Sequence, residues 1–226
     1  MQERLELIAA DGHRLAANLA LPKTKARGAL VVVQEIFGVN SHIRAVADGF
    51  AADGYLVVAP ALFDRVERSV ELGYDAADIA RGRALKDASP TDKALLDLQA
   101  AVAAARARLG PNGRVGMVGY CWGGLLSWLA ACELDGIAAS VPYYGGGIPD
   151  HAARAPRCPV LAHFGERDAL IPMAGVEELR RLYPRITVQL YPAGHGFNCD
   201  QRGSFDAASA TLARQRSWAF FREHVG

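Results

Sequence analysis

A short apolar strand, a glycine-rich turn and an apolar helix follow one another between residues 114 and 132. Residues 114–118 read Arg-Val-Gly-Met-Val, residues 119–124 read Gly-Tyr-Cys-Trp-Gly-Gly, and residues 125–132 are again mostly apolar. A chain that passes from a buried strand into a packed helix within a few residues must turn sharply, and glycines around the tip leave room for this. The pattern therefore predicts that Cys121 is held in a strained, exposed conformation at the carboxyl end of a strand.

Cys121 stands where the usual elbow of this kind has a serine. A thiol is more acidic than an alcohol, so a nearby base can ionise it for attack on a carbonyl carbon. The alternative is that Cys121 is a small core hydrophobe, as most buried cysteines are. The flanking glycines and the strand-to-helix context favour the nucleophile.

Length and composition indicate an ordinary globular chain. It has 226 residues, 51% hydrophobic and 22% charged, with a formal net charge of +1. That charge points to neither nucleic acid nor an anionic membrane as a partner. The charged amino terminus has no signal-peptide pattern, and the four cysteines lie far apart without a C-x-x-C pair. We therefore expect a cytoplasmic protein with a small-molecule substrate and no obligate protein partner.

Strand and helix patterns alternate along the whole chain, which predicts one α/β domain with a mostly parallel sheet. Residues 61–89 are different, because they are rich in charges, and we expect a loop and a short helix near 75–87 lying over a sheet end. Ser41 and Ser89 are the expected N-caps of two helices. The closing helix, 205–225, is expected to anchor in the core through Leu212, Trp218, Phe220 and Phe221. Strands are expected at 4–22 (two, joined at Asp11-Gly12), 29–33, 55–60, 114–119, 137–144, 159–165 and 186–191.

Polar residues follow the predicted strands, at the edge where a doubly wound sheet places its reacting groups. After Cys121 come Asp168 and then His195, in the order nucleophile, acid, histidine of an α/β-hydrolase triad. In this scheme His195 accepts the thiol proton and returns one to the leaving group, and Asp168 fixes the imidazole tautomer. Glu166 is a rival acid on the same loop, and Asp168 could instead cap the loop or pair with Arg167.

The tetrahedral intermediate of acyl transfer needs two N–H donors. The backbone amides of Trp122 and Ile36 are the candidates, since the first follows the nucleophile at a helix start. A metal site built from His195, Cys199 and Asp200 lacks a second cluster, so no metal is predicted. The other histidines are interpreted as structural or surface residues, at positions 13, 42, 151, 163 and 224.

Several segments together resemble the dienelactone hydrolase family (carboxymethylenebutenolidases). The segments are Gln-Glu-Ile-Phe-Gly-Val-Asn at 34–40, the elbow at 118–124, Tyr-Tyr-Gly at 143–145, Gly-Glu-Arg-Asp at 165–168 and Gly-His-Gly-Phe at 194–197. The resemblance implies a single α/β-hydrolase domain over 1–226, with a mostly parallel central sheet flanked by helices on both faces. It also implies hydrolysis of a carboxylated enol-lactone by a Cys-His-Asp triad, through a thioester and without metal or cofactor.

The resemblance further implies that Glu35 contacts the nucleophilic thiol and helps control its ionisation. The alternative for Glu35 is a strand-end residue paired with an arginine. An anionic substrate needs arginines, and the nearest candidates for the family's substrate-binding positions are Arg81 and Arg202, with Arg83 as an alternative to Arg81. A solvated charged face is the alternative for each of them.

Three rival functions remain open at this point. The chain could be a broad carboxylesterase with a different substrate. It could be a non-catalytic, redox-sensing α/β domain in which Cys121 is oxidised and reduced. A nucleotide-binding protein is disfavoured, because the G-x-G-x-x-G and P-loop patterns are both missing.

Overall fold

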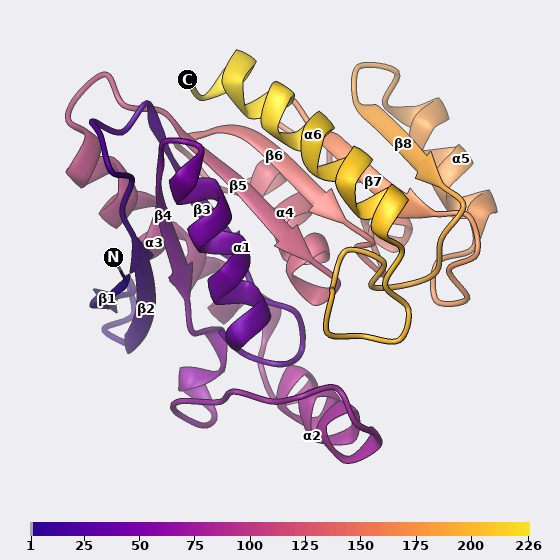
Figure 1. Ribbon diagram of the computed structural model, residues 1–226, viewed down its shortest axis with the longest axis horizontal. Helices are drawn as coiled ribbons and strands as arrows, with labels where there is room; N and C mark the ends of the chain where they lie inside the picture. Colours follow the sequence, from indigo (N-terminus) through magenta and orange to yellow (C-terminus); the bar gives the residue numbers. More distant parts are fainter. Residues whose placement is uncertain (1) are drawn as a thin grey trace.

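The computed structural model describes residues 2–226, within which eight strands form one sheet (Figure 1). The strands are β1 (Gln2–Ile8), β2 (Arg14–Ala20), β3 (Gly28–Val33), β4 (Tyr55–Pro60), β5 (Val115–Tyr120), β6 (Ile137–Tyr143), β7 (Leu161–Gly165) and β8 (Thr187–Tyr191). They lie side by side in the order β1-β2-β4-β3-β5-β6-β7-β8. β2 pairs antiparallel with β1 and β4, and the pairs from β4 to β8 are parallel. This confirms the mostly parallel sheet.

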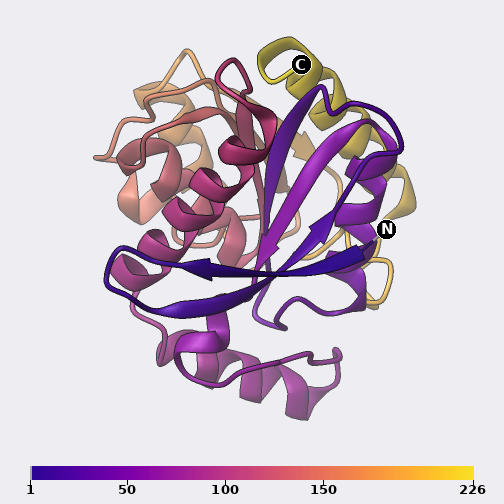
Figure 2. The ribbon, with the colours of Figure 1, turned by 90° about the vertical axis from the view of Figure 1, so that its left-hand side faces the viewer.

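Helices cover both faces of this sheet, as predicted. α1 and α6 lie on one face, and α3, α4 and α5 lie on the other (Figures 1 and 2). The helices are α1 (Ser41–Ala52), α2 (Ala76–Asp87), α3 (Thr91–Leu109), α4 (Trp122–Glu133), α5 (Met173–Leu182) and α6 (Ala207–His224). Among the described residues no helix is both long and apolar enough to cross a membrane.

The central strands β3 and β5 are buried along their whole length. Strands covered on both faces read as continuous apolar runs, which is why residues 29–33 carry no polar alternation. In the register of this pair Val33 lies opposite Gly119. The residues that follow each strand therefore emerge together at one edge of the sheet.

The charged segment between β4 and α3 contains a 3-10 turn (Leu62–Arg65) and α2, which is the short helix expected near 75–87. α2 lies beyond the end of the sheet (Figure 1). Gly82 packs against the chain after β3 so closely that a Cβ there would lie 2.2 Å from the carbonyl oxygen of Ile36. That the chain is a single domain with this segment over its active site stays a prediction.

Two predicted helix caps are wrong, each by one residue. Asn40, rather than Ser41, caps α1, and its side-chain oxygen accepts a hydrogen bond from the Ile43 amide at 3.2 Å. α3 begins at Thr91 after Pro90. The Ser89 hydroxyl instead donates to the Leu85 carbonyl at 2.8 Å and so closes the end of α2.

The buried face of α6 also differs from the prediction. Leu212 is 42% exposed, whereas Phe221 is fully buried as expected. The helix turns Ser217 into the core instead, where its hydroxyl bonds to Tyr143 at 2.7 Å. A polar residue replaces the expected apolar anchor because buried tyrosine and histidine side chains in the sheet need hydrogen-bond partners.

Candidate active site

The turn between β5 and α4 has the strained geometry expected of it. Cys121 has φ 55° and ψ −113°, a conformation that costs a non-glycine residue energy. A Cβ at Gly119 would lie 1.9 Å from the Gly123 carbonyl oxygen, and one at Gly123 would lie 2.4 Å from that of Val33. Both glycines are therefore required for the chain to turn here and to pack against the end of β3.

Cys121, His195 and Asp168 meet in a chain of two hydrogen bonds. His195 Nε2 lies 3.0 Å from Cys121 Sγ, and its Nδ1 lies 2.8 Å from Asp168 Oδ2. Asp168 Oδ1 also accepts from the Leu170 amide at 2.9 Å, which fixes the carboxylate. The rival acid Glu166 is exposed, so Asp168 is the carboxylate that faces the imidazole.

The electrostatics favour a positive charge on His195. Burial lowers the pKa of His195, but its hydrogen bonds to Asp168 and Cys121, together with their charges, outweigh burial and raise the pKa to about 10. An imidazolium held by a carboxylate on one side can donate its other proton to sulfur, which stabilises a thiolate.

Aromatic side chains enclose these groups. The ring of Tyr144, immediately after β6, meets the His195 ring edge-on at a centroid distance of 5.2 Å. Phe63 stacks on Trp122 at 5.3 Å. The sequence assigns no role to the Tyr-Tyr-Gly motif at 143–145. The position of Tyr144 directly after a central strand is nevertheless typical of a residue that lines the active site.

Glu35 is fully buried and forms an ion pair. Its Oε1 accepts from Arg202 Nη1 at 3.2 Å, and its Oε2 has no hydrogen-bond partner in the described part of the chain. Arg202 also lies over the rings of Phe37 and Tyr74, at 5.6 and 5.9 Å. Pairing with an arginine is thus the arrangement that Glu35 adopts, and the predicted contact with the thiol is not among its hydrogen bonds.

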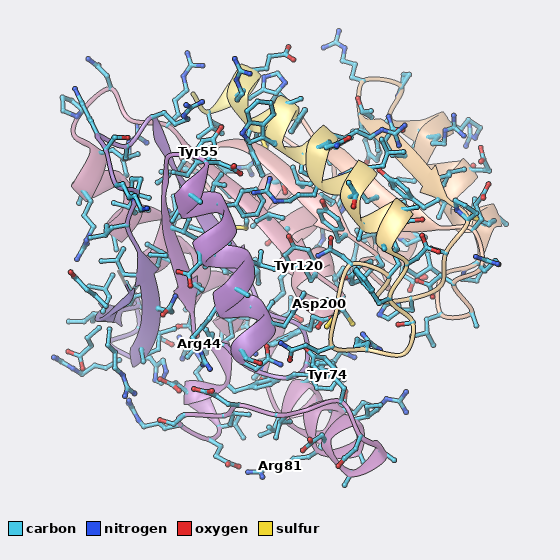
Figure 3. All side chains as sticks on the ribbon, in the orientation of Figure 1. Arg44, Tyr55, Tyr74, Arg81, Tyr120 and Asp200 are labelled. Atoms are coloured by element: carbon cyan, nitrogen blue, oxygen red, sulfur yellow. The ribbon has the colours of Figure 1, made fainter. Side chains whose placement is uncertain are left out.

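Arg81 lies elsewhere. It projects from α2 and pairs with Glu67, and both side chains are about half exposed. In Figure 3 it stands at the edge of the molecule, well away from Tyr74 and Asp200. The structure therefore brings Arg202, but not Arg81, to Glu35.

The two candidate oxyanion donors come from neighbouring chain segments. Trp122 is the first residue of α4, and Ile36 follows β3 by three residues. The segment after β3 is held in place by Gln34, whose Oε1 accepts from the Leu62 amide at 3.1 Å. The packing of Gly123 on the carbonyls of Val33 and Gln34 brings this segment against the elbow.

The structure does not bring His195, Cys199 and Asp200 together as one group. His195 faces Cys121 and Asp168, whereas Asp200 faces His42 Nδ1 at 3.0 Å. Cys199 is buried beside Glu35 and His42.

A mostly parallel sheet with helices on both faces and a strained elbow at the end of β5 defines an α/β-hydrolase. Within that class, the family model described as "Dienelactone hydrolase family" matches residues 15–225. The chain belongs to the dienelactone hydrolase family, as its motifs indicated.

Individual relatives agree with this assignment. A "Putative carboxymethylenebutenolidase" of Synechocystis sp. is 38% identical over 214 residues, covering 87% of this chain and 86% of the relative. The carboxymethylenebutenolidase of Pseudomonas putida is 30% identical over 227 residues, covering 97% and 96%. The crystal structure titled "Putative Dienelactone Hydrolase" from Klebsiella pneumoniae superposes with a TM-score of 0.84 at 31% identity, over 99% of this chain and 100% of that one. The chain is a hydrolase of carboxylic esters or lactones.

Proposed function

We propose that the chain hydrolyses small lactones or esters through a Cys121-His195-Asp168 triad and a covalent thioester. The observation that carries the proposal is the linear contact of sulfur, imidazole and carboxylate, at 3.0 and 2.8 Å. A core cysteine would not need a charged imidazole as a neighbour, which speaks against the structural role for Cys121.

In the acylation step Cys121 gives its thiol proton to His195 Nε2, its Sγ attacks the acyl carbon, and the carbonyl electron pair moves onto oxygen. The oxyanion is proposed to accept hydrogen bonds from the amides of Trp122 and Ile36. The bond to the leaving oxygen then breaks, and His195 Nε2 gives that oxygen its proton. In the second step His195 takes a proton from water as the water attacks the thioester. The carbon–sulfur bond then breaks, the carboxylic acid leaves, and His195 returns the proton to the Cys121 sulfur.

An anionic lactone is the substrate class that the Glu35–Arg202 pair supports best. A substrate carboxylate would compete with Glu35 for the guanidinium of Arg202, because both are acceptors for the same donors. Glu35 displaced in this way is proposed to influence the ionisation of the nucleophilic thiol through its charge, while His195 takes the thiol proton. Arg81 would have to leave Glu67 to contribute. A cytoplasmic location stays a prediction.

The Cys121→Ala variant tests the mechanism. We expect at least a 1000-fold loss of turnover on an aryl ester and on a carboxylated enol-lactone, with unchanged circular dichroism, since the nucleophile is removed without touching the core. Cys121→Ser, the matched control for size and polarity, should retain weak activity at best.

Two further measurements accompany these variants. Rapid quenching and mass spectrometry of the intact wild-type protein should detect an acyl adduct on Cys121. Wild-type protein should also hydrolyse the carboxylated enol-lactone faster than the neutral ester of the same lactone. Full activity in Cys121→Ala would exclude the triad.

A further inference from the structure

Three buried side chains from distant parts of the chain meet in one cluster. Glu35 follows β3, His42 lies in α1 and Cys199 follows β8. One potential ligand atom from each lies within 4.8 Å of the others. Each residue is at most 3% exposed. A carboxylate, an imidazole and a thiol buried together need partners for their polar atoms.

Two of these polar atoms have no such partner. Glu35 Oε2 and His42 Nε2 are both buried without a hydrogen bond to any described residue. The other ring nitrogen of His42, Nδ1, lies 3.0 Å from Asp200 Oδ1, so Nε2 is the nitrogen that is left to bind a ligand. Orphaned polar atoms are rare in protein interiors, and two of them in one cluster indicate that something binds there.

Two of the three side chains, His42 and Glu35, are also held from behind by a polar group. Metal-binding histidines and carboxylates usually have such support, which orients them and tunes their affinity. The two contacts join Asp200 to His42 Nδ1 and Arg202 to Glu35 Oε1. The ligand atoms that remain are one oxygen, one nitrogen and one sulfur.

We propose that Glu35, His42 and Cys199 bind a zinc ion, with the fourth position left to water. Sulfur and imidazole ligands select zinc over magnesium or calcium, which prefer oxygen alone. Ligand atoms around tetrahedral zinc lie about 3.5 Å apart, so no pair in this cluster, all within 4.8 Å, has to approach by more than about 1.3 Å. The Cys199 thiol gives up its proton on binding, and the resulting thiolate and the carboxylate balance the charge of the metal.

The test must separate this cluster from the catalytic thiol, because Cys121 and His195 can also bind zinc. It is therefore carried out in the Cys121→Ser background, which makes it independent of the proposed catalytic mechanism. Purified Cys121→Ser protein is titrated with Co²⁺ and then with Zn²⁺. We expect one equivalent of Co²⁺ to bind with a thiolate-to-metal charge-transfer band, and Zn²⁺ to displace it.

Asp200→Asn in that background is the sharpest variant, because the Asp200 side chain is 65% exposed and its loss leaves the core intact. We expect 10- to 100-fold weaker metal binding, the usual effect of removing a carboxylate behind a histidine ligand. Asp87→Asn is the matched control, with a side chain that is 74% exposed at the far end of α2. It should bind metal like its parent.

Cys199→Ser should remove the charge-transfer band, and Cys158→Ser, which alters another free thiol, should keep it. A zinc-dependent rise in the unfolding temperature of the Cys121→Ser protein, absent from Cys199→Ser, gives a readout that also reports on folding. Failure to bind one equivalent would overturn the proposal. So would identical affinities for Asp200→Asn and Asp87→Asn.

Discussion

Two buried histidines at the same end of the sheet have opposite electrostatic character. His163 lies in β7 with Nδ1 2.8 Å from the Tyr191 hydroxyl and Nε2 3.0 Å from the Ser217 hydroxyl. His195 follows β8 and has a carboxylate and a thiol in the corresponding places. Burial lowers the pKa of His163 to about 3, whereas the partners of His195 raise its pKa to about 10.

The difference shows that the partners, and not burial, decide what a buried imidazole does. Two hydroxyls satisfy both ring nitrogens of His163 without adding charge, so desolvation, together with the positive charge of Arg216, keeps the ring neutral. Asp168 supplies a negative charge to His195 that offsets the cost of burying a cation. One histidine is therefore part of the core, and the other can hold a proton for transfer.

The largest contrast is expected from the same substitution at both positions. His195→Gln should lower kcat by about 10⁵-fold or more, because the proton acceptor is lost. His163→Gln, which can keep one hydrogen bond, should leave kcat within a few-fold while lowering the unfolding free energy by about 1–3 kcal/mol. Ester hydrolysis and urea unfolding of both variants measure this. Equal losses of turnover in two folded variants would mean that the two histidines do not differ in role.

Removing the charge of Asp168 should make His195 resemble His163. Asp168→Asn keeps the shape of the side chain but cannot stabilise an imidazolium, so we expect about a 10⁴-fold fall in kcat. The pKa of His195, followed by NMR titration of the ring, should drop well below about 10. Leu170→Ala is a control on the same loop, because it keeps the backbone amide that binds Asp168. An unshifted titration in Asp168→Asn would show that another group charges the ring.

The smallest expected effect is on stability against pH, and the two histidines act on opposite sides. The unfolded chain protonates a histidine near pH 6.5. Since the folded pKa of His163 is about 3, its contribution is present above pH 6.5 and is lost as the pH falls toward 3, by about 1.4 kcal/mol for each pH unit. Since the folded pKa of His195 is about 10, its contribution is present below pH 6.5 and is lost as the pH rises toward 10.

Urea unfolding at a series of pH values measures the unfolding free energy on both the acid limb and the alkaline limb of the curve of stability against pH. His163→Gln should flatten the acid limb only, and His195→Gln the alkaline limb only. An acid limb that is unchanged in His163→Gln would contradict a neutral His163 in the folded protein.

Sequence patterns predicted the strands and turns that depend on interactions between residues close together in the chain. Continuous apolar runs marked β3 and β5, and the glycines around Cys121 marked the elbow. The order of nucleophile, acid and histidine placed three residues at one sheet edge, because the carboxyl ends of parallel strands share that edge. The cap of α1 differs from the prediction because Asn40 and Ser41 have similar capping propensities. The side chain of Ser89 bonds back to α2 and leaves Pro90 at the start of α3.

Contacts between distant segments could not be predicted in this way. Glu35 and Arg202 are 167 residues apart, and nothing periodic links them. The sequence predicts a structural or surface role for His42, since no sequence pattern shows that α1 turns it toward the loop after β8. Only the packed chain reveals that it shares a buried cluster with Cys199.

The elbow has a consequence for how such enzymes can diversify. Replacing sulfur by oxygen at position 121 alters a side-chain atom and no backbone contact. A methyl group added at Gly119 or Gly124 would instead meet a carbonyl oxygen at 1.9 or 2.4 Å, which no side-chain rearrangement can relieve. Mutation can therefore explore a change of nucleophile here in one step, while the turn that presents it tolerates almost no change.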